Sequence, residues 1–244
     1  MTRALEEREL SILKETVSSF IQDEVLKQEQ ELKKYYHELP EESARLLREK
    51  AKSSGLAAFG AKKEWGGAGL SLYERTVIYE EASKHRYGMY YPAGGAFGEE
   101  YPSFLQECTP EQIEKYVKPA VQEGKGCFLA LWEEKEDQNM QNLSCEAQKD
   151  GNGWIINGEK SYVQKMENSF FGVVLVHCLS EDGERKPTLF ILEHNDPFEQ
   201  KETRLIDVQK TNTLVFNEFR IDDSRRIGAV GDGEKLVSQY IAES

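Results

Sequence analysis

The stretch Cys127–Lys165, CFLALWEEKEDQNMQNLSCEAQKDGNGWIINGEKSYVQK, marks the point where the pattern of apolar residues changes. Upstream of it, apolar residues recur at the three- and four-residue spacing of amphipathic helices. Downstream, short runs of β-branched and aromatic residues alternate with glycine- and asparagine-rich turns, a pattern typical of strands. The stretch therefore divides the chain into a helical part and a β part.

The helical part carries recognisable start and stop signals. One long amphipathic helix is predicted from the apolar stripe Leu10, Leu13, Val17, Phe20, Ile21 and Val25. A second helix is expected to begin after Pro40 and to end before Gly55, which suits a C-terminal cap. Ser71 with Glu74 predicts a capping box for a third helix.

Two more helices are expected before the β part. Thr109 with Gln112 forms a second capping box, and the helix that follows is predicted to stop at Gly124. Residues 92–107 are expected to form another helix, so that the whole first half is helical.

The β part shows turn residues between its apolar runs. Asp150–Gly153 is expected to turn one strand into the next, and Asn157–Gly158 to form a second hairpin, because glycine and asparagine tolerate positive φ. Strands are predicted over residues 144–149, 154–156, 171–178, 188–193 and 213–221.

These patterns predict an α+β protein, with an all-helical N-terminal domain followed by an antiparallel β-barrel or sandwich domain. The expected limits are residues 1–124 for the helical domain and 125–234 for the β domain. Residues 235–244 are expected to begin a connecting helix.

The composition of the chain limits the classes of partner that we expect it to bind. The chain has 244 residues, a net charge of −13 and a pI of about 5.0, so its surface repels phosphate backbones and anionic membranes. No apolar run approaches the roughly 20 residues of a membrane span. We expect a cytoplasmic protein that binds neither nucleic acid nor membrane. The spacing of its cysteines and histidines predicts no metal site, and the four cysteines are expected to be reduced core residues.

Four ordered segments carry a family resemblance. Residues 62–83 (KKEWGGAGLSLYERTVIYEEAS), 108–126, 150–163 (DGNGWIINGEKSYV) and 213–233 resemble, in this order, motifs of the acyl-CoA dehydrogenase family. Its members are flavoenzymes that desaturate the Cα–Cβ bond of acyl thioesters. The resemblance implies FAD as cofactor, an acyl-CoA or another acyl thioester as substrate, and an oligomer with a chain of the same kind.

In that family the helical and β domains form two walls around the flavin. By resemblance, Leu131, Trp132 and Glu133 belong to the first flavin-contacting segment, and Tyr162, Val163 and Gln164 to the second. Gln138 aligns with a residue near the thioester. The family's catalytic base, a glutamate, belongs to a C-terminal helical domain, so no catalytic residue is expected within this sequence.

Several residues allow two interpretations. Trp132 is either a flavin-stacking residue or a core aromatic that fills the cofactor cleft. The acids of residues 133–137 are expected to form a solvated loop rather than a metal site, and Lys160 to be structural or charge-pairing. Two family threonines that face the flavin are replaced here by Trp132 and Gln164.

Three functions follow from these residues. The first is an acyl-CoA dehydrogenase-like flavoprotein that is truncated and needs a partner chain for activity. The second is a catalytically degenerate, non-flavin subunit that pairs with an active homologue. The third is a binding module for acyl thioesters without redox chemistry.

Overall fold

The computed structural model describes residues 5–32, 40–85, 92–134, 139–179, 183–204 and 210–243. The chain folds into two compact units, of which the first comprises residues 1–100 and 121–125, and the second residues 101–120 and 126–244. Each unit has its own hydrophobic core.

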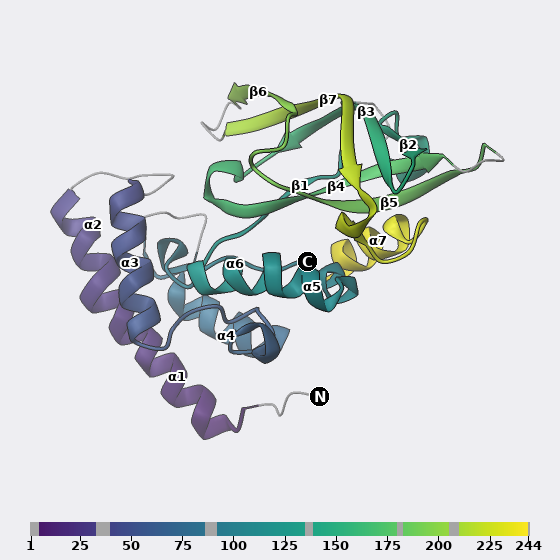
Figure 1. The fold of residues 1–244 in the computed structure, drawn as a ribbon. Helices are drawn as coiled ribbons and strands as arrows, with labels where there is room; N and C mark the ends of the chain where they lie inside the picture. Colours follow the sequence, from purple (N-terminus) through teal and green to yellow (C-terminus); the bar gives the residue numbers. More distant parts are fainter. Residues whose placement is uncertain are drawn as a thin grey trace. The chain divides into compact units, whose positions relative to one another are not determined.

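The first unit is built of helices (Figure 1). Apolar side chains of α1, α3 and α4 form its core, with Val17, Leu47, Ala51 and Ile78 fully buried. The predicted first helix is confirmed as α1 and α2, joined by a π-helical turn over Ile21–Val25. The elements are α1 (Glu7–Phe20), α2 (Leu26–Leu32), α3 (Glu41–Ser53), α4 (Leu72–Ala82) and two 3₁₀ turns (Lys63–Trp65, Pro92–Gly95).

The predicted caps of α3 and α4 are confirmed. The Ser71 side chain accepts a hydrogen bond from the Glu74 N–H at 3.3 Å, and the Glu74 carboxylate accepts one from the Ser71 N–H at 2.6 Å. Gly55 follows α3 with φ 72°, a left-handed conformation that glycine adopts without steric cost. These local signals therefore fix both helix ends.

The helix predicted over residues 92–107 is wrong. The structure has two separate 3₁₀ turns there, Pro92–Gly95 and Ser103–Glu107. Gly95 and Gly98 have φ values of 80° and 85°, in the left-handed region that a right-handed helix excludes. The backbone freedom of these glycines ends the first turn before a helix can propagate.

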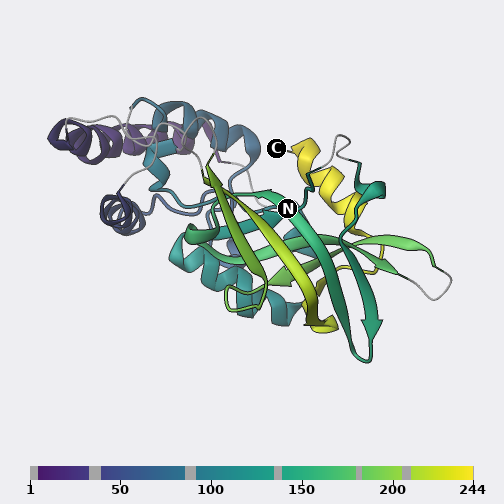
Figure 2. The ribbon, with the colours of Figure 1, turned by 90° about the horizontal axis from the view of Figure 1, so that it is seen from above.

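The second unit contains one eight-stranded sheet, mostly antiparallel, whose twist is visible from above in Figure 2. The sheet runs in the order β6-β7-β3-β2-β4-β5-β8, and β1 also pairs with β4. The pattern had missed β1, β6 and β8. The strands are β1 (Gly126–Ala130), β2 (Glu146–Asp150), β3 (Gly153–Val163), β4 (Ser169–Leu179), β5 (Arg185–Leu192), β6 (Glu199–Arg204), β7 (Lys210–Asp222) and β8 (Arg226–Ile227).

Strands β1 and β2 both pair with the same edge of β4. The strand β1 pairs in parallel with residues 169–174 of β4, and β2 pairs in parallel with residues 177–179. Since β5 pairs antiparallel with residues 172–179, β1 and β2 take successive parts of the other edge of β4. Where β1 stops and β2 has not yet begun, side chains must satisfy the backbone groups that the ladder leaves open.

The second hairpin, predicted at Asn157–Gly158, is wrong, whereas the turn between β2 and β3 at residues 150–153 is confirmed. The strand β3 continues through both residues, and the irregularity is a β-bulge opposite Glu218 of β7, which has φ 50°. The Asn157 side chain accepts a hydrogen bond from the Glu218 N–H at 2.8 Å. The Asn-Gly pair thus serves a bulge inside a long ladder.

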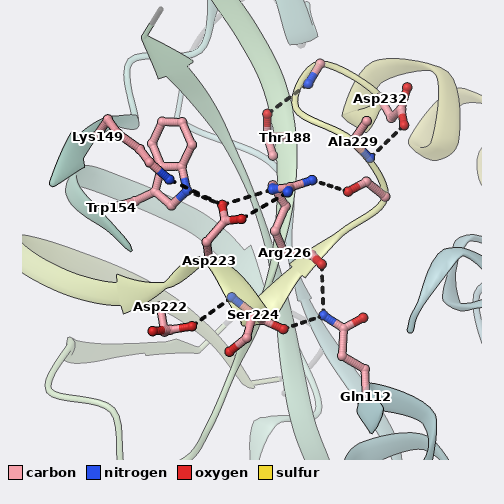
Figure 3. A network of polar contacts seen from close by, with 12 residues as sticks. Gln112, Lys149, Trp154, Thr188, Asp222, Asp223, Ser224, Arg226, Ala229 and Asp232 are labelled. Carbon is pink, nitrogen blue, oxygen red and sulfur yellow. Dashed lines mark hydrogen bonds and ion pairs between the residues drawn. The ribbon is translucent and has the colours of Figure 1, made fainter. Parts of the chain in front are cut away.

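The helical segment of residues 110–123 is bonded to the sheet of the second unit through its Gln112 side chain. The predicted Thr109/Gln112 capping box is confirmed. The Gln112 amide nitrogen also donates to the carbonyl oxygens of Ser224 and Arg226, at 2.7 and 2.8 Å (Figure 3). The segment comprises α5 (Pro110–Gln112), a π-helical turn (Ile113–Val117) and α6 (Lys118–Glu123), and it ends before Gly124 as predicted.

A second set of polar contacts surrounds Arg226 of β8, whose guanidinium also donates to the Gly228 carbonyl in the loop that follows this strand. The guanidinium pairs with both carboxylate oxygens of Asp223 at 3.0 Å, and Asp223 accepts from the Trp154 indole at 2.7 Å (Figure 3). Helix α7 (Gly233–Glu243) follows this loop. The limits 1–124, 125–234 and 235–244 remain proposals for the domains.

Three of the four cysteines are buried, as expected, whereas Cys127 is half-buried, and none of the four forms a disulfide. Burial raises the pKa of Cys108 and Cys145 to about 12. Among the helices that the structure describes, none combines the length and the apolar character that a membrane crossing requires.

We predict that Gly158→Ala destabilises the second unit by about 2 to 3 kcal/mol, because the new Cβ would lie 2.6 Å from the Cα of Cys145 at a φ of 128°. Gly151→Ala is the matched control, since it has a positive φ of 57° but open space around it. It should cost only about 1 kcal/mol. Urea unfolding measures both, and equal costs would contradict the close approach of β3 and Cys145.

Candidate functional site

The two segments singled out from the sequence lie side by side in the second unit. Residues 131–133 follow β1, and residues 162–164 stand at the end of β3. Trp132 and Ser161 form an antiparallel β-bridge, in which the Ser161 N–H donates to the Trp132 carbonyl at 2.8 Å. The structure therefore brings together the two stretches that contain all six predicted cofactor residues.

The side chains of these stretches divide into an inner and an outer set. Leu131 and Val163 are buried in the second unit, at 3% and 0% exposure. Tyr162 is 50% exposed, Gln164 is exposed and Trp132 is half-buried. Both interpretations of Trp132, stacking on a flavin or filling its cleft, stay predictions.

Tyr162 occupies an unusual backbone position. The pairing of β3 with β7 shifts between Lys160 and Val163, and Tyr162 lies in this bulge with φ 60°. A left-handed conformation costs a non-glycine residue about 1 to 2 kcal/mol, and the half-exposed ring recovers little of that through packing. Bulges often re-aim side chains beside functional sites. Tyr162 therefore lies half-exposed at a strained position of this bulge.

A buried ion pair lies between the two segments. Lys160 is fully buried, and its Nζ lies 3.0 Å from Glu133 Oε1 and 3.3 Å from the Leu131 carbonyl oxygen. The Glu133 carboxylate also accepts hydrogen bonds from the N–H groups of Ser144 and Cys145, at 2.7 and 2.9 Å. These bonds fill the gap between the end of β1 and the start of β2.

Glu133 is buried, so the prediction that it lies in a solvated loop is wrong. Its exposure is 6%. Burial alone would raise the pKa of Glu133, but Lys160 and the two backbone N–H groups outweigh it and lower the pKa to about 2. The carboxylate is therefore ionised at neutral pH and engaged in holding the backbone. The charge-pairing expected of Lys160 is confirmed.

Sequence reasoning had not predicted that Glu133 and Lys160 pair with each other. A signal was present, because period-two alternation from Trp154 and Ile156 places Lys160 on the inward face of β3. A lysine on an inward face requires a buried acceptor. The partner itself was not predictable, because it depends on the irregular path of the chain after β1.

The remaining predicted residue, Gln138, lies outside the described residues, and its substrate-side role stays a prediction. Within the part of the chain that the structure describes, no cluster of three or more histidine, cysteine or acidic side chains suits a metal ion.

The donor chemistry of the site fits a flat, polar-edged aromatic group. The Tyr162 ring and the half-buried Trp132 indole offer faces for stacking. The Tyr162 hydroxyl and the Gln164 amide are the polar groups on the exposed side of the bulge. Leu131 and Val163 give the same stretch an apolar backing. A flavin ring has these requirements, so the residues present fit it.

Comparison with known proteins agrees with this geometry. The family model described as "Acyl-CoA dehydrogenase, N-terminal domain" matches residues 7–124. The chain is 26% identical over 239 residues to (R)-benzylsuccinyl-CoA dehydrogenase of Thauera aromatica, covering 92% of this chain and 59% of the relative. It is 28% identical over 248 residues to the pig (Sus scrofa) mitochondrial long-chain specific acyl-CoA dehydrogenase, covering 96% and 55%. Over most of its length the chain is similar to acyl-CoA dehydrogenases.

Solved structures show the same fold. A Bacillus anthracis acyl-CoA dehydrogenase complexed with FAD superposes with a TM-score of 0.71 and 22% identity, covering 97% of this chain and 41% of the other. The ChsE4–ChsE5 complex of Mycobacterium tuberculosis gives a TM-score of 0.73 and 18% identity, covering 100% and 62%. The chain thus spans somewhat more than half the length of the curated relatives it matches. The predicted fold class, helices followed by a mostly antiparallel sheet, is confirmed.

We predict that Glu133 contributes to stability in a defined pH range. Because its folded pKa is depressed to about 2, the contribution is complete above the ordinary value of 4.5 and is lost as the pH falls toward 2. The difference in unfolding free energy between the parent protein and Glu133→Gln should therefore shrink across this range. The exposed neighbour Glu159, changed to Gln, serves as the control for the loss of a surface carboxylate on the same strand. A pH-independent difference would contradict the assignment.

Proposed function

We propose that this chain is the helical and β portion of an acyl-CoA dehydrogenase-like flavoprotein, which acts with FAD in the α,β-desaturation of an acyl thioester. The observation that carries the proposal is the half-exposed Tyr162, in a strained bulge next to the bridge between Ser161 and Trp132. The family and the fold support the same reading. A bound flavin would supply the acceptor for the hydride that leaves Cβ of the thioester.

Residues of this chain would form one wall of the site. The Trp132 and Tyr162 rings would contact the flat face of the cofactor, and the Gln164 amide would donate a hydrogen bond to its edge. A preorganised amide donor stabilises charge that develops in the transition state, and removing one such donor typically slows a reaction by about 10² to 10³. Leu131 and Val163 would keep this wall rigid and dry from behind.

Abstraction of the α-proton needs a base, and the acid of the bridged segments is poorly suited to that role. Glu133 is the acid within the bridged segments, but with a pKa of about 2 and a buried partner it is a poor acceptor at neutral pH. We infer that the base is supplied by residues beyond this sequence, either in the same polypeptide or in a partner of the same family. One solved structure with this fold is described as the ChsE4–ChsE5 complex, and in a complex of that kind a second chain would supply the base.

A second candidate function rests on the replaced hydroxyls. Trp132 and Gln164 stand where family members usually have threonines, and a side chain as large as Trp132 would fill part of a cofactor cleft. In that case the chain is a non-flavin subunit that pairs with an active homologue. An acyl-thioester binding module without redox chemistry is compatible with the same substitutions.

Flavin retention separates these functions. The purified chain, alone or mixed with an acyl-CoA dehydrogenase subunit, is incubated with FAD, freed of excess and examined by visible absorption. We predict retention near one flavin per chain. Tyr162→Asn keeps a residue that tolerates left-handed φ but removes the ring, and should weaken FAD binding about tenfold or more.

Tyr73→Asn is the matched control, because Tyr73 is 71% exposed on α4 of the first unit. It should leave FAD binding unchanged. Equal effects of the two variants would contradict the role of Tyr162. Absence of flavin under both conditions would overturn the flavin proposal and favour the non-flavin subunit, and calorimetry with acyl-CoA would then test the binding module.

A further inference from the structure

The segment of residues 139–145, which leads into β2, is held by ionisable side chains instead of a strand ladder. Glu133 binds the N–H groups of Ser144 and Cys145, and the backbone N–H of His177 donates to the Cys145 carbonyl at 2.9 Å. Its earlier carbonyl groups are bound by a second pair of side chains, His177 of β4 and Arg185 of β5.

His177 is fully buried and binds on both sides of its ring. Its Nε2 lies 2.9 Å from the Met140 carbonyl oxygen, and Arg185 Nε lies 3.0 Å from its Nδ1. An arginine Nε–H can only donate, so Nδ1 must be the acceptor and Nε2 must carry the proton. Arg185 also donates from Nη2 to the Leu143 carbonyl. The geometry thus requires the neutral imidazole in one tautomer.

From this arrangement we propose that His177 is a pH-sensitive positioning residue, which holds the segment 139–145 when neutral and releases it when protonated. A proton on Nδ1 would place two donors against each other and a second positive charge beside the guanidinium. The inference goes beyond the proposed function, because it needs neither flavin nor substrate.

Charged groups around the His177 ring influence how readily it is protonated. Arg185 and, across the sheet, Lys160 oppose a second positive charge, whereas Glu133 favours it. Glu146, paired opposite His177 in the β2–β4 register, is engaged by Arg185 at 2.8 Å. On the α7 side, Glu234 is bonded to Gln141 of the segment. The neighbouring thiols of Cys145 and Cys178 stay neutral, because burial raises their pKa to about 12 and about 11.

Burial and Arg185 lower the pKa of His177 below its ordinary value of 6.5, despite its bond to the Met140 carbonyl. A histidine with a lowered folded pKa stabilises the folded state above the unfolded value, and this stability is lost as the pH falls below about 6.5. The lowered pKa of His177 therefore agrees with release of the segment on acidification.

Amide hydrogen exchange measured by mass spectrometry, corrected for the intrinsic rate at each pH, tests the proposal on the whole chain. Between pH 6.5 and 5.5 the protection of residues 140–145 should fall by up to about tenfold, since one proton is linked to opening. His177→Gln offers a neutral donor and acceptor and cannot titrate, so its protection should stay constant over this range. His194→Gln, at an exposed histidine of the same unit, should behave like the parent.

The proposal is supported if protection loses its pH dependence only in His177→Gln. It is overturned if protection in the parent does not depend on pH, or if protection in His177→Gln falls as it does in the parent. If His177→Gln does not fold, Arg185→Met takes its place, because the Arg185 side chain is 43% exposed. Removing the guanidinium removes the donor and the charge that oppose a proton on Nδ1, so protection should depend less on pH than in the parent, and an unchanged pH dependence would overturn the proposal. Since none of these readouts uses FAD, failure here is distinct from failure of the flavin proposal.

Discussion

The buried pair of Glu133 and Lys160 is the interaction on which the candidate site depends. Two strands share one edge of β4, and the described residues between them, 131–134 and 139–145, belong to no strand whose ladder would satisfy their backbone groups. The Glu133 carboxylate binds two N–H groups of that passage, while Lys160 binds the carboxylate and the Leu131 carbonyl. Removing one partner would leave the other charge buried and unpaired, which typically costs about 3 to 5 kcal/mol. The pair thus fixes where residues 131–133 lie against β3.

Local signals in the sequence predicted what depends on neighbouring residues. The capping boxes of Ser71 and Thr109, the stop at Gly124 and the turn at residues 150–153 follow from side chains within four positions, and all are confirmed. The wrong predictions concern residues whose conformation depends on a partner that is distant in the sequence. Asn157–Gly158 has the composition of a hairpin, but Glu218 of β7 makes it a bulge. Likewise, the sequence does not distinguish Glu133 from the acidic residues that follow it, whereas in the structure Glu133 pairs with Lys160.

The candidate site combines a family frame with side chains of its own. Sequence alone identified the two stretches that meet, but not the left-handed bulge that turns Tyr162 outward, because backbone strain depends on the register between β3 and β7. The same frame excludes Glu133 as a base, since the bonds that place it also keep it ionised and occupied. We propose that a chain of this kind provides one wall of a site and that the proton acceptor comes from other residues.

The most direct test of this account is a double-mutant cycle on Glu133 and Lys160, measured as free energies of unfolding at neutral pH for the parent, Glu133→Gln, Lys160→Met and the double variant. Contacting residues in a shared network couple by about 0.5 to 3 kcal/mol, and a fully buried pair belongs at the upper end. The account predicts a coupling of about 2 kcal/mol or more, with the double variant less damaged than the sum of the single variants. Additive effects, with a coupling below about 0.5 kcal/mol, would contradict the claim that this pair organises the site.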